Sequence, residues 1–154
     1  MIRKRRSNKP LLFVILPIGA LCIVIGSIKL LFSQSYEPID VVKAFYTYEQ
    51  ERNYSDSWEL LHPIMKERWS KTDFMTDRLH VFVGHFGTDT FEFSVGEPEE
   101  IMNWKMNEEA QPIDVAFKFN VVQTYRGKYG KFSFVQEVYV TKEEEEWRIL
   151  WEYN

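Results

Sequence analysis

The sequence predicts an α+β fold, in which an N-terminal transmembrane helix precedes three helices packed on a curved antiparallel β-sheet. Two patterns carry this prediction. Between residues 38 and 85 the apolar residues recur at helical spacing, and after Thr88 the spacing changes to a period of two. Ahead of both lies a stretch of 19 residues without a charge, from Pro10 to Ile28. Helices followed by strands are typical of domains whose helices cover one face of a sheet.

The uncharged stretch has the length and composition of a membrane span. As a helix it would extend roughly 28 Å, close to the ~30 Å hydrocarbon core of a bilayer. Twelve of its residues are Leu, Ile, Val or Phe, which favours insertion by roughly 4–7 kcal/mol. Leu30, Leu31 and Phe32 extend it, so we expect a transmembrane helix over 10–32. A cleaved signal peptide, with Ser33 and Ser35 before the cleavage site, is the alternative.

Charge is distributed unevenly along the chain. Residues 1–9 carry five basic residues and no acid, whereas 33–154 carry 13 basic residues and all 23 acids of the protein. Five basic residues precede the uncharged stretch and one, Lys29, follows it, so the positive-inside rule predicts a cytoplasmic tail over 1–9 and an external domain. This places the protein in the cell membrane as a single-pass protein. An acidic domain repels phosphate backbones, so nucleic-acid binding is excluded. Only the tail is expected to attract anionic lipid.

The single cysteine, Cys22, limits the chemistry of the chain. It excludes an intramolecular disulfide and a cysteine metal site, and no motif for a metal or an organic cofactor is present, so we expect no cofactor. An external domain without cysteines suits a Gram-positive envelope better than a eukaryotic secretory route.

The external domain is predicted over 38–154, after a short linker at 33–37. Pro38 suits the first position of a helix over 38–53. A short helix around Trp58 follows, with Ser55 or Asp56 as its N-cap, and it ends at His62-Pro63. A further helical turn at 63–69 leads to a third helix, capped by Ser70 or Thr72 and ending near His85, with Met75, Leu79, Phe82 and Phe86 on its apolar face.

The second half alternates apolar and polar residues and predicts strands joined by short turns. The expected strands are 90–95, 101–106, 113–125, 132–140 and 147–153. The connecting turns are expected at 107–112, 126–130 and 142–145.

Two segments resemble the nuclear-transport-factor-2-like (NTF2-like, or cystatin-like) superfamily. The segment DVVKAFYTYEQERNYSDSWELLHP resembles its first two helices. The segment YRGKYGKFSFVQEVYVTKEEEEWRILWEY is similar to the end of the NTF2-like domain at the N-terminus of penicillin-binding transpeptidases, with Trp147, Arg148 and Trp151 in its closing strand. The resemblance implies a cone of three helices and a curved sheet outside the cell. No serine has a lysine three residues later, so it implies that domain without the transpeptidase and without its catalysis.

The titratable residues show no catalytic spacing. His80 and His85 are five residues apart, about 140° around an α-helix, so we expect that they do not share a metal from one face. Asp73, Asp77 and His80 follow one helix face, which we interpret as a solvated face rather than a metal or acid–base cluster. The Glu143–Glu146 run is interpreted as a solvated hairpin tip, with binding of a cation or a basic partner as the alternative.

Aromatic residues supply the candidate cavity. The aromatic residues Phe45, Tyr48, Trp58, Trp69, Phe117, Phe119, Trp147 and Trp151 are expected mainly in the core, and cones of the resembled superfamily often have a cavity at their open end. A ligand pocket also needs convergent polar groups. Tyr46, His62, Gln123 and Gln136 are the candidates for a ligand or partner cavity.

These observations predict a membrane-anchored, extracytoplasmic module that binds an envelope protein or a cell-wall component and is not an enzyme. One alternative is an assembly component of a secretion or conjugation complex, since such machines use single-pass proteins with NTF2-like external domains. Another is a small-molecule isomerase or dehydratase-like enzyme in the cone, which needs an acid or histidine in the cavity beside a tyrosine. The sequence does not predict the oligomeric state.

Overall fold

The computed structural model describes residues 37–152. The predicted tail (1–9), the predicted membrane span (10–32) and all but the last residue of the predicted linker (33–37) lie outside this range. Among residues 37–152, no helix combines the length and the apolar character that a membrane crossing needs. The helices are α2 (Pro38–Gln50), α3 (Tyr54–Glu59), α4 (Pro63–Arg68), α5 (Lys71–Arg78) and the π-helix η1 (Leu79–His85), which continues α5.

Local signals in the sequence start most of these helices. Pro38 opens α2 as predicted, and Ser70 caps α5 by accepting a hydrogen bond from the Asp73 backbone at 3.2 Å. The start of α3 was predicted wrongly, because its N-cap is Asn53 and not Ser55 or Asp56. Arg52 adopts a positive φ of 60°, which ends α2 and lets the next helix begin at once.

Five antiparallel strands form one sheet: β1 (Phe91–Val95), β2 (Glu99–Trp104), β3 (Ile113–Gly127), β4 (Gly130–Glu143) and β5 (Glu146–Leu150). The order is β1-β3-β4-β5, and β2 also pairs with β3. The strand β3 is long enough to hold both partners, β2 along 113–118 and β1 along 121–125. Backbone hydrogen bonds from Ile149 to Leu60 and from His62 to Ile149 cover the outer edge of β5.

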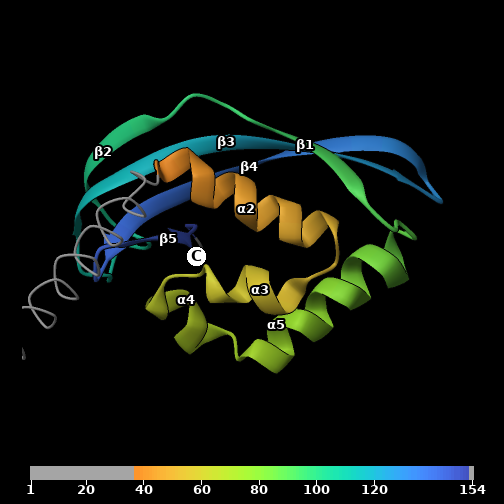
Figure 1. Cartoon of the computed structure of the whole chain (residues 1–154), viewed down its shortest axis with the longest axis horizontal. Helices are drawn as coiled ribbons and strands as arrows, with labels where there is room; N and C mark the ends of the chain where they lie inside the picture. The colour runs from red at the N-terminus through yellow and green to blue at the C-terminus, as the bar shows by residue number, and fades with distance from the viewer. Residues whose placement is uncertain (1–36, 153–154) are drawn as a thin grey trace, which may run out of the picture. The chain divides into compact units, whose positions relative to one another are not determined.

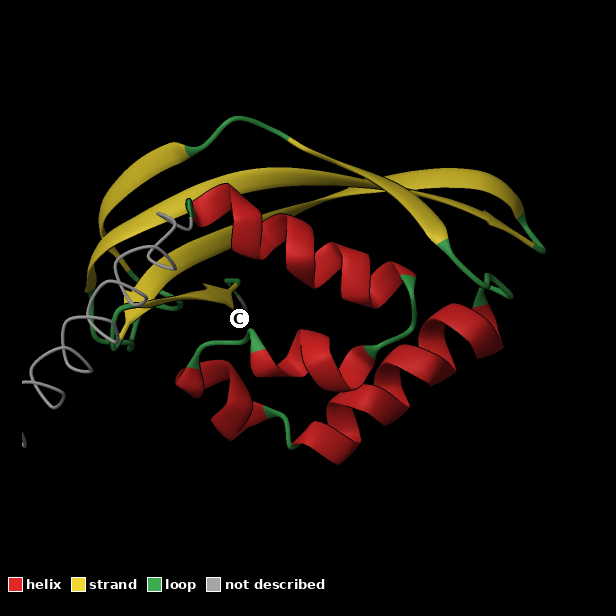
Figure 2. Cartoon of the chain, viewed as in Figure 1, coloured by secondary structure: helices red, strands yellow, loops and turns green. Residues whose placement is uncertain are grey.

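The sheet curls over the helices (Figures 1 and 2). The helix α2 lies under the concave face and contacts β1, β4 and β5, while α3 packs on α2 and α5 packs on α3. The described residues therefore form an α+β fold with a curled antiparallel sheet and helices on its concave side. Its most buried side chains are Val42, Phe45, Tyr46, Leu61, Met65, Phe119, Val121, Tyr125, Val138, Val140, Ile149 and Leu150.

An aromatic cluster closes the end of the fold where η1 meets the β3–β4 hairpin. The ring of Tyr125 stacks on those of Phe82, Phe91, Phe132 and Phe134 at centroid distances of 5.0 to 5.4 Å, and Phe86 lies at 6.4 Å. We call these six residues the Tyr125 cluster. They come from η1 and the residue after it, β1, β3 and β4, so the cluster joins the helices to the sheet.

Two turns in this half have special backbones. Gly127 lies against the residue after η1, where a Cβ atom would clash with the Phe86 carbonyl oxygen, so only glycine fits. The β4–β5 hairpin turns at Glu144 and Glu145, with φ values of 47° and 70°. Two positive φ values are typical of a type I′ turn, which usually holds Asn and Gly.

Candidate functional site

Three of the four predicted cavity residues are joined by hydrogen bonds. Tyr46 on α2 donates its hydroxyl to Gln136 Oε1 at 2.9 Å, and Gln123 Nε2 donates to the same oxygen at 3.2 Å. Tyr125 in turn donates to Gln123 Oε1 at 2.8 Å. The chain of bonds runs across α2, β4 and β3, and burial raises the pKa of both tyrosines, so they remain neutral donors.

The strand register explains this convergence. Gln136 is the polar exception in the otherwise apolar inward face of β4, and it pairs with Val121 on β3. Gln123 lies two residues further along β3, on the same face. Both glutamines therefore point to the concave side, where Tyr46 reaches them from α2. The network leaves the Nε2 group of Gln136 without a hydrogen-bond acceptor among residues 37–152.

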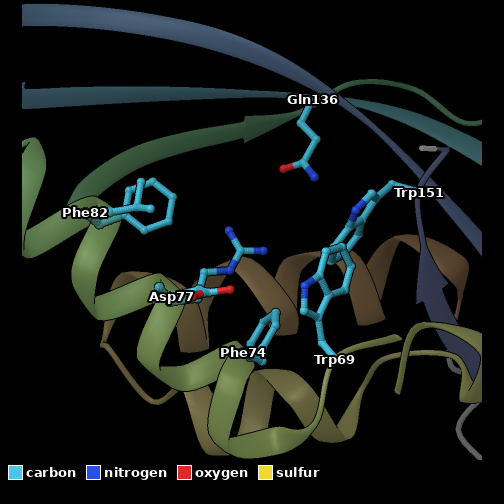
Figure 3. A pocket seen from close by; sticks show the side chains of 8 residues that line it. Trp69, Phe74, Asp77, Phe82, Gln136 and Trp151 are labelled. Atoms are coloured by element: carbon cyan, nitrogen blue, oxygen red, sulfur yellow. The ribbon is translucent and has the colours of Figure 1, made fainter. Parts of the chain in front are cut away.

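Gln136 also lines a pocket of about 300 Å³, which we call the tryptophan pocket. Its apolar walls are the aromatic rings of Trp69, Phe74, Phe82 and Trp151. Figure 3 shows Gln136 extending from β4 toward the space, with Phe82 on one side and the two tryptophans on the other. The tryptophan rings lie 5.8 Å apart between centroids. This is the mix of apolar walls and few polar groups that small-molecule sites have.

Arg78 is the positively charged residue of this pocket, and it was not among the residues predicted from the sequence. Its guanidinium carbon lies 4.9 Å from the ring centroid of Phe74, 5.7 Å from that of Phe82 and 5.9 Å from that of Trp151. Phe74, Arg78 and Phe82 are four residues apart, which places them on one side of the helix. That aromatic–arginine–aromatic spacing is the signal in the sequence that would have found it.

A buried glutamate stands behind Arg78. Glu49 Oε2 lies 3.4 Å from Arg78 Nε, and Glu49 Oε1 accepts a hydrogen bond of 2.6 Å from Ser57. The Glu49 side chain is 4% exposed. Burial raises the pKa of its carboxyl group, while Arg78 and Ser57 oppose that shift. Glu49 is not a wall of the pocket, so its contacts hold the Arg78 side chain from behind.

The predicted apolar face of the third helix is partly wrong. Of the four predicted residues, Met75, Phe82 and Phe86 are half-buried, but Leu79 is 47% exposed. Phe74, which was not predicted, is buried. The reason is the change from α5 to the wider turn of η1 at Leu79, which shifts the side that faces the sheet.

His62, the fourth predicted cavity residue, lies elsewhere. It precedes α4, where its Nδ1 accepts a hydrogen bond from the Ile64 backbone at 3.3 Å. Its Nε2 lies 3.3 Å from Glu143 Oε2 at the end of β4. The structure therefore does not bring His62 to Tyr46, Gln123 and Gln136; it joins α4 to the β4–β5 hairpin.

His80 and His85 lie side by side, although the spacing of an α-helix would place them on different faces. Their Nε2 atoms lie 2.9 Å apart, and the rings are nearly perpendicular. In a π-helix residues five apart lie one turn above each other, so the 140° separation of an α-helix does not apply. Among residues 37–152, no group of three His, Cys, Asp or Glu side chains is arranged to hold a metal.

Asp73 and Asp77 are both exposed, in agreement with the interpretation as a solvated helix face, but they make different contacts. Asp73 accepts a hydrogen bond from Ser70 at the start of α5, whereas Asp77 lines the tryptophan pocket.

The fold class that these elements define is α+β with a curled antiparallel sheet. In comparisons with known proteins, no family model and no curated protein matches this chain.

Proposed function

We propose that the chain is a membrane-anchored, extracytoplasmic binding module with an NTF2-like domain, and that it binds its partner through the tryptophan pocket. The curled sheet with helices on its concave face is compatible with the NTF2-like cone. The apolar stretch over 10–32 supports the anchor, and the five basic residues before it, against Lys29 near its end, support an external position of 33–154.

The observation that carries the proposal is the convergence on Gln136. A hydrogen-bond network from α2 and β3 fixes this side chain at the wall of a pocket that also holds Arg78 and four aromatic rings. An ordinary core position would be filled by an apolar side chain. A polar group held in place beside open space is what a binding site requires.

The test is site-specific photo-crosslinking in intact cells. A photoreactive amino acid is placed at Val81 or at Asp77, both of which line the pocket, and at Val135, an exposed residue of β4 outside the pocket, as the matched control. We expect the two pocket positions to capture the same envelope protein or wall fragment, and Val135 not to. Equal labelling at all three positions, or capture of cytoplasmic proteins, contradicts the proposal. Recovery of a multiprotein secretion complex would favour the assembly-component alternative.

A second candidate is an isomerase or dehydratase-like enzyme, and Glu49 is the observation that favours it. A buried acid with a raised pKa near a tyrosine is typical of acid–base sites. It ranks second because both carboxylate oxygens are engaged by Ser57 and Arg78 and do not face the pocket. Turnover of a bound metabolite that is lost in Glu49→Gln would favour the enzyme.

A further inference from the structure

Arg78 brings to the tryptophan pocket hydrogen-bond donors that have no acceptor among residues 37–152. A guanidinium has five N–H donors. Arg78 directs Nε to Glu49, and its two terminal nitrogens donate no hydrogen bond to any residue in the described range 37–152. The charge is in contact with three ring faces instead. A carboxylate is the group that such a fork binds best, through two parallel N–H bonds.

Gln136 supplies a second set of donors at the same pocket. Its Oε1 is occupied by Tyr46 and Gln123, which fixes the orientation of the amide, so the free Nε2 group is a donor and not an acceptor. Both polar side chains that are held in place in this pocket therefore offer hydrogen to a ligand. A ligand that brought only N–H groups would leave the donors of Arg78 and Gln136 without acceptors.

We propose that the tryptophan pocket binds a small monocarboxylate with a flat apolar body, its carboxylate held by Arg78 and Gln136. The ligand class rests on the binding function proposed above. The flat body would pack beside the Arg78 guanidinium, against Phe82 or the two tryptophans, which lie on opposite sides of the space (Figure 3). A volume of about 300 Å³ is at the lower end for ligand sites, so the ligand is small.

The charges around the pocket disfavour the main alternatives. Aromatic walls alone also suit an organic cation, but the guanidinium of Arg78 already lies against three of the rings and repels a second cation. Asp77 would attract that cation, but its side chain is exposed, so water and salt screen its charge more than that of Arg78. Asp77 lines the same pocket and repels a second negative charge on the ligand. One carboxylate on an otherwise neutral body satisfies both conditions.

The carboxylate belongs either to a free acid or to the C-terminus of a peptide, and the probes separate these sources. The free acid is 4-fluorophenylacetate, and the peptide-like acid is N-acetyl-4-fluorophenylalanine. Each is compared with its neutral amide, and 4-fluorophenethylamine serves as the cation. Binding is followed by fluorine NMR line broadening with the full chain in lipid nanodiscs, and empty nanodiscs are the blank. We expect both amides and the cation to bind at least ten-fold more weakly than the better acid.

Two substitutions at the pocket have opposite expected effects. Gln136→Glu keeps an acceptor for Tyr46 and Gln123 but replaces the free donor by a negative oxygen, so the acid should bind at least ten-fold more weakly. Asp77→Asn removes the repelling charge from an exposed position, so the acid should bind several-fold more tightly. Both substitutions should change binding of the acid by a larger factor than binding of its neutral amide, because the amide carries no charge. Arg78→Gln combined with Glu49→Gln removes the ion pair without leaving a buried charge, and should abolish the preference for the acid.

The outcomes distinguish the ligand class from the site. If the amides or the amine bind as well as the acids, the proposed requirement for a carboxylate is wrong, although the pocket remains a binding site. If the acids bind equally to the wild type, Gln136→Glu and Asp77→Asn, they do not bind in the tryptophan pocket as proposed. No saturable broadening by either acid up to about 10 mM, weaker than a ligand of this size should bind, also overturns the inference. If Val81 and Asp77 still crosslink selectively in cells, only the ligand class fails; if they do not, the proposed function fails with it.

Discussion

His62 acts as a neutral residue in two contacts that need different ring nitrogens. Its Nδ1 accepts from the Ile64 backbone, so the proton of the neutral ring is on Nε2, which faces Glu143. Burial lowers the pKa of His62 from its ordinary value of 6.5, and Glu143 only partly opposes this shift. Protonation would place a hydrogen on Nδ1 and break the cap of α4.

We predict that His62→Asn makes the stability of the protein less dependent on pH. The pKa of His62 is lower in the folded than in the unfolded protein, so between these two pKa values the folded protein binds fewer protons. The wild-type free energy of unfolding should therefore have its full value above the pKa of the unfolded ring and should decrease as the pH falls below it. Asparagine keeps an oxygen that caps the helix and does not titrate. Urea denaturation from about pH 5 to pH 8 measures both slopes, and equal slopes in the two proteins contradict the prediction.

The tryptophans mark how far a residue type can be interpreted from sequence. Trp58 and Trp151 were expected mainly in the core, but both are half-buried and pack against it. Trp58 lies under the ammonium groups of Lys66 and Lys71, and Trp151 is a wall of the pocket. Apolar spacing identifies the side of an element that is turned inward, but it does not show whether that side meets another element or an open space.

At the scale of the elements, periodicity predicted most of the fold. The change from helical spacing to alternation after Thr88 is where the helices end and the sheet begins, and all five strands lie within a few residues of their predicted positions. The wider turn of η1 was not predictable, because a π-helix has no distinct composition. That single change explains both the contact of His80 with His85 and the exposure of Leu79.

The sequence predicted only part of the site, and the reason why a residue could or could not be predicted differs from one residue to another. Gln136 interrupts an apolar alternation, so the sequence alone marks it as unusual. Tyr46, Gln123 and Gln136 meet because of the β3–β4 register and the position of α2, which spacing does not encode. The spacing of Phe74, Arg78 and Phe82 indicates an arginine between two rings of one helix, but its contact with Trp151 and with the pocket comes from the tertiary structure.

The β4–β5 hairpin gives a prediction about an element. Glu144 and Glu145 both have positive φ, a conformation that costs roughly 1–2 kcal/mol for a residue with a side chain. The double substitution Glu144→Asn with Glu145→Gly supplies the residues that a type I′ turn prefers. We expect it to raise the free energy of unfolding by about 1 kcal/mol after the larger entropy loss of glycine, measured by chemical denaturation.

A matched control separates the backbone effect from the effect of charge. Glu144→Gln with Glu145→Gln removes the same two charges but keeps side chains that disfavour positive φ. This variant should show less than half of the gain. An equal gain in both variants would mean that relief of repulsion within the Glu143–Glu146 run, and not turn geometry, limits the stability of the hairpin.

At the scale of the whole molecule, charge predicts the orientation in the membrane. Five basic residues precede the apolar stretch and Lys29 follows it, so the tail should be cytoplasmic and 33–154 external. Protease added to intact protoplasts should remove the domain while an N-terminal epitope tag stays protected. Survival of the domain with loss of the tag would show the opposite orientation.

The Tyr125 cluster has a consequence for the timing of motion in the domain. A half-turn of the Tyr125 ring leaves its hydroxyl on the rotation axis, so the bond to Gln123 does not resist it, but the five surrounding rings do. Densely packed rings turn only when their surroundings expand together. We expect separate proton signals for the two edges of Tyr125 and one averaged set for Tyr129, which is 75% exposed. The temperature at which the Tyr125 signals merge would report how often η1 lifts away from the sheet, and averaged signals already at low temperature would show that this end of the fold opens freely.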